Sequence, residues 1–513
     1  MFRKIIGSTT VIGKMTLLSR LLGYLRDMLI ARLFGASIYT DAFFIAFKIP
    51  NLFRRFFAEG AFSTAFIPVL TEYHETRNKN NLNLFLDSQI SALIVILGLV
   101  VGFGIILAPF VIIIFAPGFE QDSERYQLSV GLLRITFPYL IFISLTAFFA
   151  SILNVFGRFA IAAFTPALLN ICMILAAIFL SPFFSVPVYS LAVGVFIGGV
   201  LQLTLQYFSV RRLGFRVTIR SGFEHEGVKK VFKLMVPGIL GGSVAQLNIL
   251  IDSIIASFLT AGSISWLYYS DRVIELPLGV FGIALATAIL PSLSKFAISA
   301  EFEKFDAAVK HSINWTLFLG IPSTVGIILL AEPIVVSLFQ YGEMTIFDVE
   351  QCTKSLRAYA LGLPAFILIK VLAAAYFARK DMLTPVKFAV VALILNTILN
   401  VVFMNYFGHV GLALATSIAA WLNAMLLFVC LKISENTING DEKINFLRIM
   451  VASVFMSLIL YWLASKLDFD AISEFWLRFL YLFLIIGAGS LTYFATSFVL
   501  GMNKQKINQL YGI

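Results

Sequence analysis

Long apolar runs separated by short polar breaks cover most of the 513 residues. A run of about 20 apolar residues is long enough to cross a bilayer as a helix. On that criterion the pattern predicts about fourteen spans and an all-α integral membrane protein. The predicted spans lie near residues 20–34, 40–70, 89–116, 128–156, 161–181, 187–209, 236–259, 265–294, 312–339, 355–378, 384–404, 409–431, 446–465 and 475–500. We expect the second span to be broken at residues 48–51, because Pro50 removes a backbone donor and kinks a helix.

The first twelve spans form two sets of six that resemble one another. Matching positions recur in the same order, separated by roughly 219–227 residues. Because six is an even number, both sets have the same orientation and form parallel halves with a cavity at their interface. We therefore predict an N-lobe over residues 1–225, a C-lobe over 226–435 and two extra helices within 436–513. The matches include Asp27 with Asp252, Pro50 with Pro277, Arg134 with Arg357, Pro138 with Pro364 and Arg158 with Arg379.

Residues 19–68 carry many charges although the segment is apolar enough to be embedded in a membrane. A charged side chain at the centre of a bilayer helix costs roughly 2.5–3.5 kcal/mol even on a lenient scale. These charges are tolerable only if most face water, one another or a charged ligand. Since basic groups outnumber acidic ones, the expected ligand is an anion. The charged residues are Arg20, Arg26, Asp27, Arg32, Asp41, Lys48, Arg54, Arg55 and Glu59.

The second half adds charges at the equivalent place, Asp271, Arg272 and Glu275. The pseudo-symmetry predicts that arginines of both halves line one central cationic cavity. A guanidinium suits this role because its planar fork binds phosphate oxygens bidentately. In the first span Arg20 and Asp27 share a face, and Arg26 points about 100° away from Asp27. A closed ion-pair network that only holds the helices together is the alternative.

Asp252 is a lone carboxylate in an apolar span, with Asn248 one turn before it. Asn396 and Asn400 present amide oxygens on one face of a later span. A carboxylate with two or three neutral oxygens suits a sodium ion or a proton. Hydrogen bonding between helices by these polar residues is the alternative interpretation.

Composition narrows the class of protein. Charged residues make up 13% of the chain and apolar residues 60%, whereas a soluble domain has about 25% charged residues. The net charge is +10. Because no basic run stands clear of apolar sequence, the excess of Lys and Arg indicates cytoplasmic loops and does not indicate nucleic-acid binding. The distribution of Lys and Arg predicts that both termini are cytoplasmic. Three scattered cysteines and four scattered histidines give no disulfide or metal pattern, and no catalytic motif is present. We expect a transporter, not an enzyme.

Several segments resemble the MurJ (MviN) family of lipid II flippases, within the multidrug/oligosaccharidyl-lipid/polysaccharide exporter superfamily. The resemblance rests on SRLLGYLRD at 19–27, TDAFFIAFKIPNLFRRFFAEGAFSTAFIP at 40–68, WLYYSDRVIELPLGVFGIALATAILPSLS at 266–294 and LFQYG at 338–342. It implies two six-helix lobes around a central cavity, with the last two helices forming a groove for a lipid tail. It also implies a bacterial inner-membrane flippase for undecaprenyl-diphosphate-linked disaccharide-pentapeptide, the peptidoglycan precursor, working by alternating access.

The same resemblance places essential cavity residues on five positions here: Arg20, Arg26, Asp41, Arg54 and Arg272. We expect the four arginines to bind the diphosphate, and Asp27, Asp41, Lys48, Arg55, Glu59 and Asp271 to support the cavity. Asp252, Asn396 and Asn400 match the placement of a sodium site in some members, which implies a sodium or proton coupling ion assisted by the membrane potential. No other cofactor is expected. Partners implied are lipid II, membrane lipids and the cell-wall synthesis machinery. Export of another lipid-linked oligosaccharide or of cationic drugs, or a scaffold without transport, are the alternatives.

Overall fold

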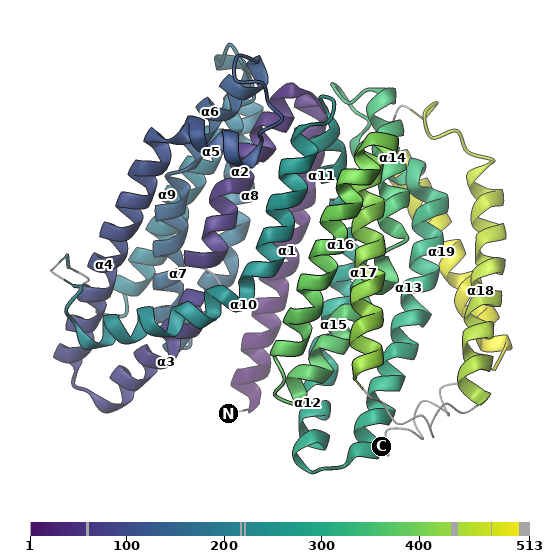
Figure 1. The fold of residues 1–513 in the computed structure, drawn as a ribbon. Coiled ribbons are helices and arrows are strands. Elements are labelled where there is room, and N and C mark those ends of the chain that lie inside the picture. The colour runs from purple at the N-terminus through teal and green to yellow at the C-terminus, as the bar shows by residue number, and fades with distance from the viewer. Residues whose placement is uncertain are drawn as a thin grey trace. The chain divides into compact units, whose positions relative to one another are not determined.

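A computed structural model describes residues 2–57, 61–215, 218–219, 222–431, 440–472 and 474–501. Every regular element in these ranges is helical, as the apolar pattern predicts (Figure 1). The chain divides into two compact units, residues 1–265 and 266–513. The first unit therefore also includes the long helix after residue 225, and the three-part division at 225 and 435 stays a prediction.

The first unit consists of ten α-helices and one 3₁₀ turn in its described part, followed by the start of α11. Helix α8 packs against α1 and α9, α2 packs against α6, and α10 packs against α3. Side-chain caps fix where two of the helices begin: the Asn78 carbonyl accepts from the Asn81 amide at 2.9 Å and the Ser123 hydroxyl from the Tyr126 amide at 3.2 Å. The elements are α1 (Phe2–Phe34), α2 (Ile38–Phe57), α3 (Ala61–Thr76), α4 (Lys79–Ile106), α5 (Ala108–Phe115), α6 (Glu124–Thr136), α7 (Tyr139–Val155), α8 (Phe159–Phe179), η1 (Ser181–Phe183), α9 (Tyr189–Arg211) and α10 (Glu226–Ser257).

The second unit begins within α11 (Ser263–Pro277), where a π-helical turn η2 (Leu278–Gly282) interrupts the helix before α12 (Ile283–Ile298). Helix α13 packs against α14, α15 and α18, and α17 packs against α15 and α16. A capping box at Thr345 and Asp348 starts α14. The remaining elements are α13 (Phe302–Phe339), α14 (Ile346–Ala360), α15 (Leu363–Ala378), α16 (Leu383–Phe407), α17 (His409–Cys430), α18 (Gly440–Ala464) and α19 (Phe475–Val499).

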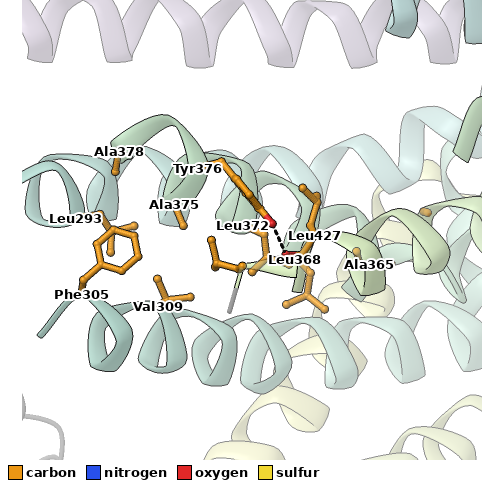
Figure 2. Close-up of a cluster of buried hydrophobic side chains, with 13 residues drawn as sticks. Leu293, Phe305, Val309, Ala365, Leu368, Leu372, Ala375, Tyr376, Ala378 and Leu427 are labelled. Atoms are coloured by element: carbon orange, nitrogen blue, oxygen red, sulfur yellow. Dashed lines mark hydrogen bonds between the residues drawn. The ribbon is translucent and has the colours of Figure 1, made fainter. Parts of the chain in front are cut away.

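A buried apolar cluster holds α12, α13, α15 and α17 of the second unit together. Leu293, Phe305 and Leu372 pack within it, each at most 1% exposed. Figure 2 shows Tyr376 among them, with its hydroxyl donating to the carbonyl of Leu427 at 2.9 Å. That hydrogen bond satisfies the one polar atom that the tyrosine brings into this cluster.

Buried Arg478 fixes the start of α19 in the second unit. Its guanidinium donates to the carbonyl of Ile472 at 2.6 Å and to that of Gln340, at the end of α13, at 3.0 Å. Helices α18 and α19 expose many large apolar side chains elsewhere, among them Leu458, Trp462 and Leu491. Such an apolar surface is typical of helices that face lipid.

Each of the fourteen predicted spans coincides with one helix or a consecutive pair, except 265–294, which covers α11, η2 and α12. In the described residues, ten helices are long and apolar enough to cross a membrane, and the bent pair α14 and α15 makes an eleventh. The other three predicted spans coincide with α1, with α2 and α3, and with α10. Helices α1 and α2 carry several charges, so length and composition alone do not identify them as spans, and their insertion stays a prediction.

Pro50 does not break α2, contrary to the expectation of an interruption at residues 48–51. The helix continues to Phe57. A proline withholds the amide that would bond to the carbonyl four residues earlier, here that of Ala46. The hydroxyl of Thr136, fully buried on α6, donates to this carbonyl at 3.1 Å. The neighbouring helix thus supplies the missing donor, which allows α2 to remain helical.

The connection between α9 and α10 is attached to α4. Both oxygens of Asp87 accept from Thr218, one from its amide at 2.7 Å and one from its hydroxyl at 2.6 Å. His225 caps α10 by accepting from the Gly227 amide at 3.1 Å through Nδ1. Burial lowers the pKa of His225, which keeps the imidazole neutral and able to accept. Figure 1 shows α10 running across the end of the first unit next to α3 and then turning.

Candidate functional site

Arg26 and Asp27 form a buried ion pair on α1. Arg26 is 6% exposed and Asp27 1%. The guanidinium donates from Nε at 2.8 Å and from Nη2 at 2.6 Å to the same carboxylate oxygen. Its Nη1 donates to the side-chain carbonyl of Asn170 on α8 at 2.9 Å. Asn170 in turn donates to the carbonyl of Ser19 at 3.0 Å, so one amide connects α8 to both the ion pair and the α1 backbone.

The expectation that Arg26 points away from Asp27 was wrong. Adjacent helical residues do lie about 100° apart, but the arginine side chain is long enough to reach back to the carboxylate beside it. Arg20 is exposed although it was placed on the same face as buried Asp27. Arg54 on α2 is half-buried and Lys48 is exposed. Glu59 lies outside the described residues, and the side chain of Arg55 is not described.

Asp41, another carboxylate of the predicted set, accepts four hydrogen bonds. It is fully buried in the first turn of α2. One oxygen accepts from Arg125 Nη2 and from the Gly262 amide, both at 2.8 Å. The other accepts from the amide and the hydroxyl of Ser265 at 2.9 and 2.6 Å. Asp41 therefore fastens the connection between α10 and α11 to α2 and α6.

A glycine allows another close contact with the end of α10 in the first unit. The Gly118 amide donates to the hydroxyl of Ser257 at 2.9 Å. A Cβ at this position would lie 2.5 Å from the backbone of Ser257 and Phe258, so only glycine allows the loop between α5 and α6 to approach the end of α10.

Replacing Asp41 with alanine should loosen this connection and lower stability by about 3–5 kcal/mol, because Arg125 loses its buried partner. The measurement is the thermal unfolding of the purified protein, together with the labelling rate of a cysteine at Thr260. Ser265→Ala removes one of the bonds and should cost about 1 kcal/mol. Equal stability of the Asp41 and Ser265 variants would contradict the central role of the carboxylate.

Arg272 lies on α11 of the second unit and is half-buried. Its Nη1 donates to Glu275 at 2.7 Å, and its Nη2 donates to the Tyr268 hydroxyl at 3.0 Å. Asp271 beside it is exposed. These contacts, one helix turn after Arg272 and one before it, hold the guanidinium in place while leaving it half-buried. The π-helical turn that follows Pro277 is a feature often found at functional sites.

Of the residues predicted to form the cation site, Asp252 belongs to the first unit and Asn396 and Asn400 belong to the second. Asp252 on α10 is half-buried and accepts from Asn248 Nδ2 at 3.0 Å. Asn396 and Asn400 are buried on α16. Within the described residues no cluster of three His, Cys, Asp or Glu side chains has a metal-binding arrangement. A site made of one carboxylate and two amides stays a prediction.

Comparison with known proteins shows the family to which the chain is related. The family model described as "Lipid II flippase MurJ" matches residues 30–480. The chain belongs to the MurJ family. A "Probable lipid II flippase MurJ" of Vibrio cholerae is 42% identical over 98% of each chain. A "Lipid II flippase MurJ" of Burkholderia cenocepacia is 41% identical over 81% of this chain and 82% of the relative.

Solved structures agree with that assignment. One described as "Lipid II flippase MurJ, inward closed conformation" is 30% identical, with a TM-score of 0.81 over 96% of this chain and 98% of that one. An inward-facing MATE transporter of the MOP superfamily has a TM-score of 0.68 at 14% identity, over 84% of this chain and 99% of that one. The second likeness shows the fold alone. This MurJ family member is thus a multi-pass membrane protein of a transporter family.

Sequence reasoning missed the partners of the predicted residues in this MurJ family member. Asn170, Arg125 and Ser265 were not singled out, although each bonds to Arg26 or Asp41. An asparagine in an apolar span was a usable signal for Asn170, because buried amides need partners. Arg125 lies between two predicted spans, and nothing in the local sequence indicates that it pairs with a carboxylate 84 residues away. The shared cavity of Arg20, Arg26, Arg54 and Arg272 stays a prediction.

Proposed function

We propose that this protein is a lipid II flippase, which moves the undecaprenyl-diphosphate-linked peptidoglycan precursor from the cytoplasmic to the periplasmic leaflet. The observation that carries the proposal is the match to the MurJ family model over residues 30–480. Relatives with that printed name are about 40% identical over nearly the whole chain. The protein would lie in the bacterial inner membrane with both termini in the cytoplasm, as its basic loops predict.

The headgroup of the substrate carries a diphosphate, and Arg20, Arg26, Arg54 and Arg272 are the residues proposed to bind it. Guanidinium forks match phosphate oxygens in geometry as well as charge. Arg26 enters this role already paired with Asp27, so a diphosphate would have to compete with the carboxylate or share the guanidinium with it. Because the carboxylate of Asp27 can take the guanidinium back, the diphosphate would be bound strongly enough to be selected and weakly enough to be released.

Movement of the anion would follow alternating access, with binding in a state open to the cytoplasm and release in one open to the periplasm. An inside-negative potential assists the outward transfer of negative charge by about 2.3 kcal/mol per charge per 100 mV. The polyprenyl tail would remain against α18 and α19, whose many large exposed side chains are apolar. The synthases that polymerise the released precursor are the proposed protein partners.

A cation at Asp252, Asn396 and Asn400 would reset the carrier after release. If it does, Asp252→Ala should remove the dependence of flipping on the sodium or proton gradient, whereas Asn248→Ala should retain it. The measurement is flipping in proteoliposomes with each gradient imposed separately. An unchanged gradient dependence in the Asp252 variant would return this carboxylate to a structural role.

Depletion of the protein in cells tests the flippase proposal directly. Lipid II should accumulate, and an enzyme added from outside that cleaves lipid II should no longer reach it. Restoring the wild-type protein should restore cleavage. If the accumulated precursor remained cleavable from outside, another protein would perform the flipping, and export of a different lipid-linked oligosaccharide would become the better explanation.

A further inference from the structure

A cavity of about 380 Å³ lies inside the first unit, away from every residue assigned to the substrate or the coupling ion. Helices α3, α7, α8 and α9 form its walls. Pockets for small ligands begin at about 300 Å³, so this volume is sufficient for the head and the first carbons of an amphiphile. The cavity is partly open, and most of its walls belong to apolar membrane-spanning helices. These walls therefore suit a ligand with an apolar part.

Two buried polar atoms in the walls have no hydrogen-bond partner in the described part of the chain. They are the hydroxyl of Thr146 on α7 and Oε1 of Gln206 on α9, whose residues are 3% and 0% exposed. Two other hydroxyls of the lining donate within their own helices, Ser151 to the carbonyl of Ala147 at 2.8 Å and Thr165 to that of Ile161 at 2.9 Å. Buried polar groups are normally hydrogen-bonded, so each exception requires an explanation.

The orientation of Gln206 is fixed by its other contacts. Its Nε2 donates to Thr165 Oγ1 at 2.5 Å and to the Ile161 carbonyl at 3.4 Å. A carbonyl can only accept, so the amide nitrogen must face α8, and Oε1 is left as an acceptor. Pro166 on α8 adds to this pattern, because it withholds the amide that would bond to the carbonyl of Ala162, which also lines the cavity.

Besides these acceptors and the hydroxyl of Thr146, the lining holds half-buried Asn154, whose amide both donates and accepts. The fitting ligand therefore carries groups that can donate and accept hydrogen bonds, as hydroxyls do. All fourteen lining residues are described, and none of them is charged, so an ammonium ion would lack a counter-charge. We propose that this cavity binds a neutral amphiphile that carries hydroxyl groups at one end of an apolar chain. Monoacylglycerols have this chemistry. The ligand would join α3, α7, α8 and α9 and stabilise the first unit.

The test uses the full-length protein in phosphatidylcholine nanodiscs and a photoreactive 1-monoacylglycerol. Label should appear on peptides of α7 and α8 and should be displaced by unlabelled monoacylglycerol. A matched probe with both hydroxyls capped as methyl ethers should label about fivefold less, as expected for the loss of a hydrogen bond to a buried acceptor. Equal labelling by the two probes would overturn the proposal, as would label that monoacylglycerol does not displace.

Variants of the two unpartnered groups add a second readout. Thr146→Val and Gln206→Leu should each reduce labelling about fivefold. Gln202→Leu is the matched control, because Gln202 lies one turn earlier on α9 and donates to the Thr165 carbonyl at 2.8 Å, but does not line the cavity. Its labelling should match wild type. Equal losses in the Gln202 and Gln206 variants would mean that the glutamines only hold α8 in place. If the Gln206 variant fails to fold, the Thr146→Val variant and the capped probe still test whether the cavity binds the ligand.

Discussion

Replacing Arg272 with alanine should abolish lipid II flipping while the protein accumulates and unfolds normally. Its contacts with Glu275 and Tyr268 lie one helix turn after it and one before it on α11. Ion pairs that are this accessible contribute only about 0–1 kcal/mol, so the loss of the side chain should not unfold the second unit. A complete loss of transport would therefore report on substrate binding. The measurement is complementation in depleted cells together with the melting temperature of the purified protein.

Two further variants separate charge, geometry and general effects at Arg272. Arg272→Lys keeps the charge but removes the planar fork, so it should fail to restore full activity. Arg357→Ala is the matched control, because Arg357 is an exposed arginine of the same unit that donates to the Ile328 carbonyl at 3.2 Å. It should support growth like wild type. Normal flipping by the Arg272→Ala variant would rule out its role in binding the diphosphate.

Replacing Arg26 with alanine should abolish transport for two reasons, only one of which concerns the substrate. Removing one partner of a buried ion pair is expected to cost about 3–5 kcal/mol, because Asp27 would lose the guanidinium while remaining 1% exposed. The melting temperature should fall and transport should be lost. These two effects must be separated before Arg26 is assigned to the diphosphate.

The double variant Arg26→Met with Asp27→Leu makes that separation. Exchanging a buried ion pair for apolar residues of similar volume is often neutral or stabilising, so the double variant should unfold close to wild type. Asn170 loses one contact in both variants, which makes them comparable. If Arg26 binds the diphosphate, the double variant should be stable and still inactive. A stable double variant that flips lipid II would make the pair a structural lock only.

The pattern of apolar runs was sufficient to predict the helices, because the length of a membrane span and its apolar character are properties of consecutive residues. It was less reliable about interruptions. Pro50 was expected to break the second span, but Thr136 donates to the freed carbonyl from another helix. The matching proline of the second half, Pro277, is followed by a π-helical turn. Whether a proline breaks a helix depends on a neighbour that the local sequence does not identify.

The local sequence also does not identify the partners of the charged residues. Their number in residues 19–68 predicted an unusual segment, because charges in apolar sequence are costly wherever the chain folds. Their partners were decided by tertiary structure: Asn170 lies 144 residues from Arg26, and Ser265 lies 224 residues from Asp41. Helical periodicity gives the face on which a side chain lies, but not the helix that packs there. The sequence by itself therefore determined the class of protein and its family, and only the packing of helices distant in sequence decided which charges are bonded.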